Sequence, residues 1–413
     1  MSVLTLSMPK LDSQTVIARC RELAAISEMS RGTFRTFLSP AMKRCYDVVD
    51  SWMEAAGMTV SVDAAGNLRG IRSGSEPGMR LLLMGSHLDT VLDAGAFDGI
   101  LGVVLAIALT ESFAGRVLPF DIEVIGFSDE EGVRYVPFIG SRALVGSLDS
   151  QTLARTDDAG ISMEQAIREF GLDPAGIPTV ALTRQPLGFL EFHIEQGPVL
   201  EDARQSVGIV ESIVGQMRAS VKFIGSANHA GTTPMHLRRD ALTAAAQWIT
   251  VVEQLARQTP NLVATVGKIE AHPGISNVIP GEVAVSLDLR HTDDTVRQRA
   301  FDELRQAAAD IARQRHIRAV SSEPVSQQTV YMDETLTRKL AAASPIGTRR
   351  MVSGAGHDAM ILAPHMPAAM LFLRSPGGVS HHPAENVLPE DVDLALAIGQ
   401  TFIESLANEY QPS

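Results

Sequence analysis

Two short apolar runs, each ending in polar residues, place the strongest constraint on the fold of this chain. Residues 80–87 (RLLLMGSH) and 120–127 (FDIEVIGF) have the length and the mostly apolar character of strands that are buried on both faces. The apolar segment 99–113 between them has the length of a helix. Strands that alternate with helices predict an α/β domain with a largely parallel sheet. Ligands of such sheets bind beyond the carboxyl ends of the strands.

Two helices and a hairpin are expected before this sheet, and a different rhythm follows it. Residues 11–28 and 40–57 have helical spacing, and strands at 58–62 and 67–71 flank a turn at Ala65–Gly66. From about Val214 we predict a strand, a helix, two strands, a helix and a strand, at 217–224, 240–257, 263–270, 282–289, 295–316 and 317–322. This β-α-β-β-α-β order is ferredoxin-like.

The chain has 413 residues, more than one hydrophobic core usually holds, and the α/β rhythm returns after about Gln327. We therefore predict a discontinuous catalytic domain at 1–213 and 327–413, with a mostly parallel mixed sheet and helices on both faces. An inserted α+β ferredoxin-like domain occupies 214–326.

Composition excludes several classes of function. The net charge of −13 argues against nucleic-acid binding, which needs clustered Lys and Arg. No apolar run reaches transmembrane length, and the first residues lack a basic flank and a cleavage site, so neither a membrane anchor nor a signal peptide is expected. Cys20 and Cys45 form no metal or redox motif, which favours a reduced, cytoplasmic setting.

Histidines and carboxylates gather in polar, glycine-rich turns near the expected strand ends. These residues are His87, Asp89, Asp98, Glu130, Glu131, His193, His381 and His382. A single histidine at a strand end is more often a structural hydrogen bonder, and paired glutamates are usually a solvated turn. Together, however, they offer the imidazole and carboxylate ligands that Zn²⁺ and Mn²⁺ accept.

The residue types suggest a division of roles within a two-metal site. Asp98, in GAFDG, suits a carboxylate bridge, because the flanking glycines let the backbone come close. Asp89 suits a partner that orients the imidazole of His87. Of the adjacent glutamates Glu130 and Glu131, one would ligate a metal and the other would hold the attacking water as general base.

Seven blocks of the sequence resemble, in order and over nearly the whole chain, the hydantoinase/carbamoylase group of the M20 metallopeptidase-like amidohydrolases. The blocks are GSHLDTVLDAGAFDGILG, FSDEEGVRY, FHIEQGPVLE, GSANHAGTTPM, SNVIPGEVAVSLDLRHTD, SGAGHDAM and SHHPAEN. The resemblance implies a binuclear site with two Mn²⁺ or Zn²⁺ ions per subunit, held by His87, Asp98, Glu131, His193 and His381. Asp98 would bridge the two ions, and His382 fills a variable position of the family pattern.

The resemblance also implies the remaining roles. Glu130 would be the general base and His229 the donor to the oxyanion of the tetrahedral intermediate. Substrate contacts would come from Gln196, Arg218, Asn277, Arg290, Gly356 and His357. Arg290 suits a clamp for a substrate carboxylate, although without the resemblance a surface ion pair at a strand end would be the plainer explanation. The inserted domain would act as a lid, pair two subunits into a homodimer and complete the neighbour's active site.

The expected reaction is hydrolysis of the carbamoyl (ureido) amide of a small carboxylate. Segments 35–41 (RTFLSPA) and 156–162 (TDDAGIS) are similar to allantoate amidohydrolases. The first expectation is therefore that allantoate and water give ureidoglycine, ammonia and carbon dioxide. N-carbamoyl-L-amino acids and ureidoglycolate stay open as substrates. An aminoacylase or dipeptidase, and a non-catalytic binding protein on the same fold, are the competing readings.

Overall fold

The structure is a computed structural model that describes residues 12–75, 78 and 80–410. Its contacts divide the chain into unit 1, Met1–Glu211 with Tyr331–Ser413, and unit 2, Ser212–Val330. The sequence pattern had set these boundaries after residues 213 and 326, so they differ by two and four residues. No helix among the described ranges has both the length and the apolar character needed to cross a membrane.

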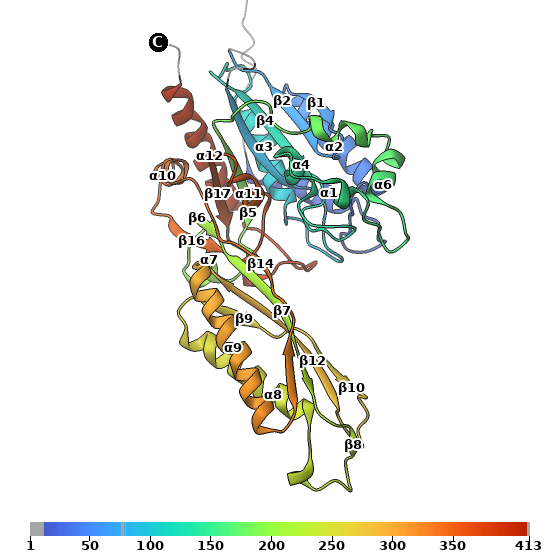
Figure 1. Cartoon of the computed structure of the whole chain (residues 1–413). Helices are drawn as coiled ribbons and strands as arrows, with labels where there is room; N and C mark the ends of the chain where they lie inside the picture. The colour runs from blue at the N-terminus through green and yellow to red at the C-terminus, as the bar shows by residue number, and fades with distance from the viewer. Residues whose placement is uncertain (1–11, 76–77, 79, 411–413) are drawn as a thin grey trace, which may run out of the picture. The chain divides into compact units, whose positions relative to one another are not determined.

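Unit 1 is built on a mixed sheet whose four central strands are parallel (Figure 1). In spatial order the strands run β1-β2-β4-β3-β5-β17-β6-β15, with β16 also paired to β6. The parallel core is β4, β3, β5 and β17, while β2 and β6 flank it in antiparallel directions. The bounds are β1 Thr59–Val62, β2 Leu68–Arg72, β3 Leu81–His87, β4 Asp121–Phe127, β5 Gly188–Ile194, β6 Val207–Ile213, β15 Val330–Tyr331, β16 Arg349–Ser353 and β17 Ala368–Leu373.

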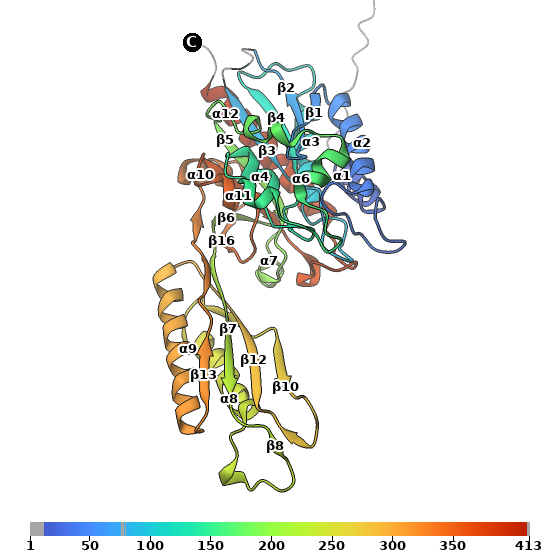
Figure 2. The same cartoon turned by 45° about the vertical axis from the view of Figure 1, so that its right-hand side comes forward.

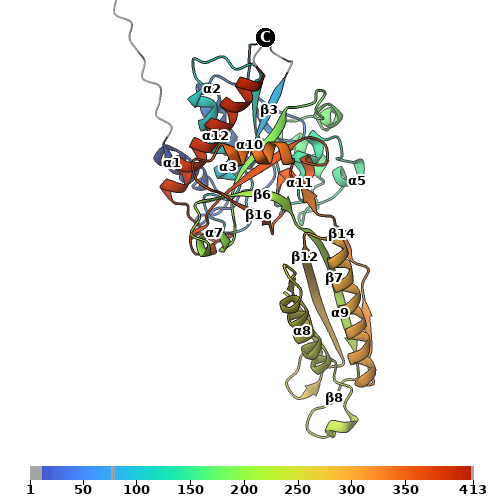
Figure 3. The ribbon, with the colours of Figure 1, turned by 90° about the vertical axis from the view of Figure 1, so that its left-hand side faces the viewer.

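Helices pack against this sheet, and Figure 3 shows α1 and α12 on one side of it and α11 on the other. Helix α3 contacts β3, β4 and β5 as well as α1 and α12, which explains why this helix is apolar all round. The bounds are α1 Ser13–Ala24, α2 Pro40–Ala55, α3 Ile100–Ser112, α4 Ile139–Leu144, α5 Ser150–Leu153, α6 Met163–Phe170, η1 Pro174–Thr179, α7 Val199–Asp202, α10 Glu334–Ala342, α11 Asp358–Leu362, η3 Pro376–Gly378 and α12 Pro389–Glu409.

The first helix is shorter than the expected segment 11–28, whose residue 11 lies outside the described residues. Helix α1 ends at Ala24, and the buried guanidinium of Arg35 donates to carbonyls at this end of the helix and just after it. Its Nη1 donates to Leu23 O at 2.7 Å and to Ile26 O at 2.8 Å. A buried cation thus satisfies carbonyls that a helix terminus leaves without partners.

Unit 2 has an antiparallel sheet in the order β10-β12-β7-β13, against which α8 and α9 pack (Figure 2). The bounds are β7 Gly215–Ile224, β8 Asn228–His229, η2 Met235–Leu237, α8 Ala241–Gln258, β9 Val263–Thr265, β10 Ile269–His272, β11 Val278–Ile279, β12 Glu282–His291, α9 Asp294–Gln314, β13 Arg318–Ser321 and β14 Val325–Gln327. The expected strand 263–270 is split into β9 and β10. The hydroxyl of Ser286 accepts the N–H groups of Gly267 and Lys268 between them, while Lys268 O accepts the main-chain N–H of Ser286.

Candidate active site

Four predicted ligand positions lie at the carboxyl ends of the central parallel strands. Strand β3 ends at His87, β4 leads into Glu130 and Glu131, β5 carries His193, and the loop after β17 carries His381. Asp98 precedes α3, which crosses back over the sheet. Parallel strands thus bring residues from distant parts of the sequence to one edge.

The ligand atoms are close enough to share ions. His87, Asp98 and His193 form one set, and Asp98, Glu131 and His381 form another, with the donor atoms of each set within 4.8 Å of one another. Asp98 Oδ1 lies 3.3 Å from His193 Nε2, and Asp98 Oδ2 lies 3.1 Å from His381 Nε2. Asp98 therefore faces one set with each oxygen, as a bridging carboxylate must.

Glu130 lies beside the same cluster. Its Oε2 is 3.9 Å from His87 Nε2, and its side chain is buried. His87, Glu130 and Glu131 form a third set of donors within 4.8 Å. The geometry therefore brings both glutamates to the centre and does not itself divide ligand from base.

Hydrogen bonds hold the ligands in place. Asp89 accepts the main-chain N–H groups of Glu130 and Glu131, each at 3.0 Å. The Nδ1 atom of His87 lies 2.9 Å from the main-chain carbonyl of Asp89. Asp89 thus holds the ring of His87 with its main-chain carbonyl and the glutamate turn with its carboxylate.

Charges in the cluster perturb one another strongly. Burial, and then the charge of Glu131, raise the pKa of Glu130 well above its ordinary value. Burial opposes the charged form of His87, but the carboxylates of Asp89 and Asp98 outweigh it and raise the pKa of His87 to about 9. Burial lowers the pKa of His193 to about 4, so this ring is neutral at pH 7. Closely packed carboxylates with imidazoles need compensating positive charge.

Gln196 reaches into the same cluster. Its side-chain nitrogen donates to both oxygens of Asp98, each at 3.1 Å, and lies 3.3 Å from His381 Nε2. Its buried Oε1 has no hydrogen-bond partner within the described part of the chain. A buried polar atom without a partner beside an imidazole and carboxylate set fits a divalent cation in this position.

His357 and Gly356 lie close to the proposed metal ligands. The ring of His357 packs against that of His193 with 4.4 Å between centroids, and the side chain is 1% exposed. A Cβ atom at Gly356 would lie 2.9 Å from the ring of Phe138. His357 therefore supports a ligand ring, while any substrate contact of Gly356 would come from its main chain.

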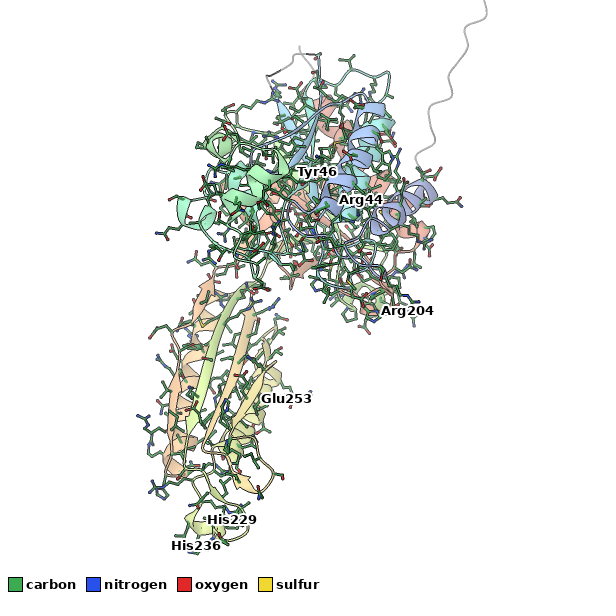
Figure 4. The ribbon with its side chains drawn as sticks, turned by 90° about the vertical axis from the view of Figure 1, so that its right-hand side faces the viewer. Arg44, Tyr46, Arg204, His229, His236 and Glu253 are labelled. Atoms are coloured by element: carbon green, nitrogen blue, oxygen red, sulfur yellow. The ribbon has the colours of Figure 1, made fainter. Side chains whose placement is uncertain are left out.

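The unit 2 candidates His229 and Asn277 meet in a short ribbon. Strand β8 pairs with β11, and Asn277 O accepts the N–H of Ala230 at 2.9 Å. The Nδ1 atom of His229 accepts the N–H groups of Gly231 and Thr232, which leaves the proton on Nε2. An exposed Nε2–H is the form of histidine that donates to an oxyanion. Figure 4 shows His229 and His236 at the same end of unit 2.

Arg218 and Arg290 lie elsewhere in unit 2 and share one partner. Asp288 Oδ2 lies 2.9 Å from Arg218 Nε, and Asp288 Oδ1 lies 2.8 Å from Arg290 Nε. Arg290 pairs across the sheet with Gln216, close to Ser212 where unit 2 begins. The ion pair expected as the plainer explanation of Arg290 is present, and the side chain is still 30% exposed.

His229 and Arg290 belong to opposite ends of the unit 2 sheet. The β8–β11 ribbon lies beyond the Glu282 end of β12, whereas Arg290 is near the other end of that strand. Eight residues of extended strand separate these ends by about 27 Å. One copy of unit 2 therefore cannot apply both side chains to the same small substrate.

The sequence had not singled out two buried glutamates beside the cluster. Glu385 accepts the N–H groups of Phe97 and Asp98 at 2.8 and 2.9 Å. Glu191 accepts the hydroxyl of Ser86 at 2.9 Å, and burial raises its pKa to about 7. An acidic residue inside the run GFLEFHI, where the other polar side chain is the proposed ligand His193, is a signal that could have identified Glu191.

The two segments that resemble allantoate amidohydrolases lie together in unit 1. Arg134 forms an ion pair with Asp157 at 3.0 Å and donates to Phe37 O at 2.9 Å, which ties segment 156–162 to segment 35–41. Both segments line a cavity of about 690 Å³, and none of the proposed metal ligands lines it.

Comparison with known proteins places these features in a family. Residues 83–405 match the model of peptidase family M20/M25/M40. Allantoate deiminase 1 of Glycine max is 37% identical over 97% of this chain and 90% of its own length. The N-carbamoyl-L-amino acid amidohydrolase of Geobacillus stearothermophilus is 40% identical over 90% of this chain and 93% of its own length.

A solved structure is similar to this chain over nearly its whole length. The crystal structure of an amidase of the hydantoinase/carbamoylase family from Burkholderia multivorans has a TM-score of 0.90 and 31% identity, covering 98% of this chain and 99% of that one. The resemblance and the amidohydrolase class predicted from the sequence are confirmed. The chain belongs to peptidase family M20/M25/M40 and is similar there to amidases of the hydantoinase/carbamoylase group.

Proposed function

We propose that this amidohydrolase cleaves the carbamoyl amide of a small ureido carboxylate at a binuclear metal centre. The observation that carries the proposal is Asp98, whose two oxygens face two separate sets of imidazole and carboxylate donors. His87, Asp98 and His193 would hold one divalent ion, and Asp98, Glu131 and His381 the other. Mn²⁺ and Zn²⁺ both accept these ligands. Bound ions of this kind lower the pKa of a water molecule and polarise a carbonyl oxygen.

Glu130 is the proposed general base. Its buried position beside His87 and its raised pKa suit a carboxylate that accepts a proton from water and returns it to the departing nitrogen. His229 would donate its Nε2–H to the oxyanion. Asn277 and Arg290 would hold the substrate carboxylate, with Gln196, Arg218, Gly356 and His357 as further candidate contacts or supports.

Allantoate is the first candidate substrate, and N-carbamoyl-L-amino acids are the second. Relatives named for each activity have similar identities to this chain, at 37% and 40%. The match to the allantoate deiminase covers more of the chain, 97% against 90%. The segments joined by Arg134 add to this preference. Ureidoglycolate remains a further alternative.

Unit 2 is proposed to be a ferredoxin-like lid that pairs two subunits and completes the neighbour's active site. Its strand order β10-β12-β7-β13 and its two helices support the ferredoxin-like assignment. The separation of His229 from Arg290 supports sharing between subunits, because one small substrate needs these side chains from two copies. A cytoplasmic location is proposed on the two free, buried cysteines, Cys20 and Cys45.

An ammonia-release assay tests the function. The protein, loaded with Mn²⁺ or Zn²⁺, is incubated with allantoate, ureidoglycolate, N-carbamoyl-β-alanine and N-carbamoyl-L-amino acids. We expect ammonia from at least one of them, with the highest kcat/KM for allantoate, and loss of activity after chelation that added metal reverses. Full activity in rigorously metal-free protein would contradict the metal centre. Release of amino acids from acyl or peptidyl substrates, without ammonia from ureido compounds, would contradict the reaction.

A further inference from the structure

Glu385 joins the loop that carries Asp98 to the loop that carries His381. Its side chain is 5% exposed. Oε1 accepts the main-chain N–H groups of Phe97 and Asp98, at 2.8 and 2.9 Å. Oε2 accepts the hydroxyl of Ser380 at 3.1 Å. One carboxylate therefore links two segments that are far apart in the sequence and that each supply a proposed ligand.

The surrounding chain is shaped to admit this carboxylate. A Cβ atom at Gly95 would lie 2.6 Å from Oε1 and 2.4 Å from Cβ of Glu385, so the backbone of the Asp98 loop passes directly against it. Ser380 also lies 3.5 Å from Asp98 Oδ2 through its hydroxyl. Glu385 belongs to none of the three donor sets found among the described residues. Its contacts point to support of the ligands and not to ligation.

We propose that Glu385 is a positioning residue that fixes Asp98 relative to His381 and so sets the ligand spacing of the metal centre. The inference rests on the proposed metal centre. If the ligand side chains are held in place before an ion binds, they lose less conformational entropy on binding, and the metal affinity is higher. Partners that orient metal ligands are worth roughly 10–100-fold in metal affinity.

Two substitutions of Glu385 distinguish the effect of its hydrogen bonds between the loops from the effect of its negative charge. Glu385→Gln removes the charge but keeps an oxygen that can accept both N–H groups and a nitrogen that can donate to the Ser380 hydroxyl. Glu385→Asp keeps the charge but is one methylene shorter, so its carboxylate cannot reach the N–H groups of Phe97 and Asp98 while it also accepts the Ser380 hydroxyl. Glu390→Asp, in the exposed first turn of α12, makes the same chemical change away from the cluster and is the matched control.

The experiment is a Mn²⁺ titration of each purified full-length protein, followed by calorimetry and by metal analysis after dialysis. We expect Glu385→Asp to bind Mn²⁺ about 10–100-fold more weakly, while Glu385→Gln and Glu390→Asp stay close to the unsubstituted protein. Thermal melting of the metal-free proteins shows whether each variant is folded. If Glu385→Asp does not fold, Ser380→Ala, which cuts one arm of the link, should still weaken binding.

Other results would overturn the inference. Unchanged affinity in folded Glu385→Asp and Ser380→Ala would show that the link does not set the ligand spacing. A loss in Glu385→Gln as large as in Glu385→Asp would show that charge, and not the link, matters. Absence of Mn²⁺ and Zn²⁺ binding in the unsubstituted protein would instead remove the metal centre itself, a failure that this titration distinguishes from failure of the link.

Discussion

A Cβ atom on Gly99 would lie 2.4 Å from the imidazole ring of His87, because the turn before α3 passes directly against that ring. Gly99 also has φ of +67°, a conformation that other residues adopt with strain. We predict that Gly99→Ala displaces His87 and weakens Mn²⁺ binding at least tenfold, on the scale of lost ligand support. Gly115→Ala is the control, since its φ is +77° and nothing lies within 4 Å of the added carbon. Equal metal affinities in the two variants would show that His87 tolerates the contact.

Substitution of the two adjacent glutamates should lower two different properties, the rate of catalysis for Glu130 and the metal content for Glu131. Glu130→Gln should keep the fold and the metal but lower kcat by roughly 10²–10⁴-fold, because the proposed base is gone. Glu131→Gln should instead lower the metal content, because a ligand is gone. Metal analysis and steady-state kinetics on the same preparations separate these effects. The reverse pattern would exchange the two roles, which the third donor set, with His87, Glu130 and Glu131, makes a real alternative.

Local pattern and strand topology suffice to predict the central sheet and the residues at its edge. The runs at 80–87 and 120–127 became β3 and β4, and polar residues at their ends meet because parallel strands end at one edge. The sequence pattern does not predict contacts between a side chain and main-chain atoms that are distant in the sequence. Glu385 lies in a quoted motif, yet its partner is the N–H of Asp98, 287 positions away. The split between β9 and β10 likewise depends on the side chain of Ser286 on a neighbouring strand.

Arg35 offers a test of the stability of the fold that does not depend on an activity assay. It is 0% exposed and donates to the carbonyls of Leu23, Ile26 and Leu88. Arg35→Met keeps much of the volume but removes the charged donor from these three carbonyls, so the free energy of unfolding should fall by about 3–5 kcal/mol. Arg44→Met removes an exposed arginine and should change it little. Chemical denaturation measures both, and similar midpoints would show that water reaches the buried carbonyls.

We predict that Arg290 binds the substrate carboxylate. Arg290→Ala should cost about 1.5–3 kcal/mol in kcat/KM, the scale of a hydrogen bond to a charged group. The loss should be much smaller for a substrate analogue in which an amide replaces that carboxylate. Asp288, which Arg290 shares with Arg218, holds the guanidinium in place and is retained in the variant. Equal losses with both compounds would show that Arg290 acts only through its ion pair.

Sharing of the active site between subunits can be tested by reassembling inactive variants. His229 lies on β8, beyond the Glu282 end of β12, and Arg290 lies near the other end of β12, so one copy of unit 2 cannot supply both side chains to one small substrate. We predict that Arg290 serves the active site of its own chain. His229 is then expected to serve the partner.

The test pairs Glu130→Gln with His229→Ala, each inactive alone, in a mixture that is unfolded and refolded together. In a two-fold dimer, random pairing makes about half the dimers mixed, and one of the two sites in each mixed dimer has both native residues. About a quarter of all sites should therefore recover if His229 acts on the partner.

Glu130→Gln paired with Arg290→Ala is the internal control. If Arg290 serves its own chain, every site in that mixture keeps one lesion and none recovers. Recovery only in the Arg290 mixture would exchange the two assignments. No recovery in either mixture, with mixed dimers confirmed by mass spectrometry, would rule out a shared site.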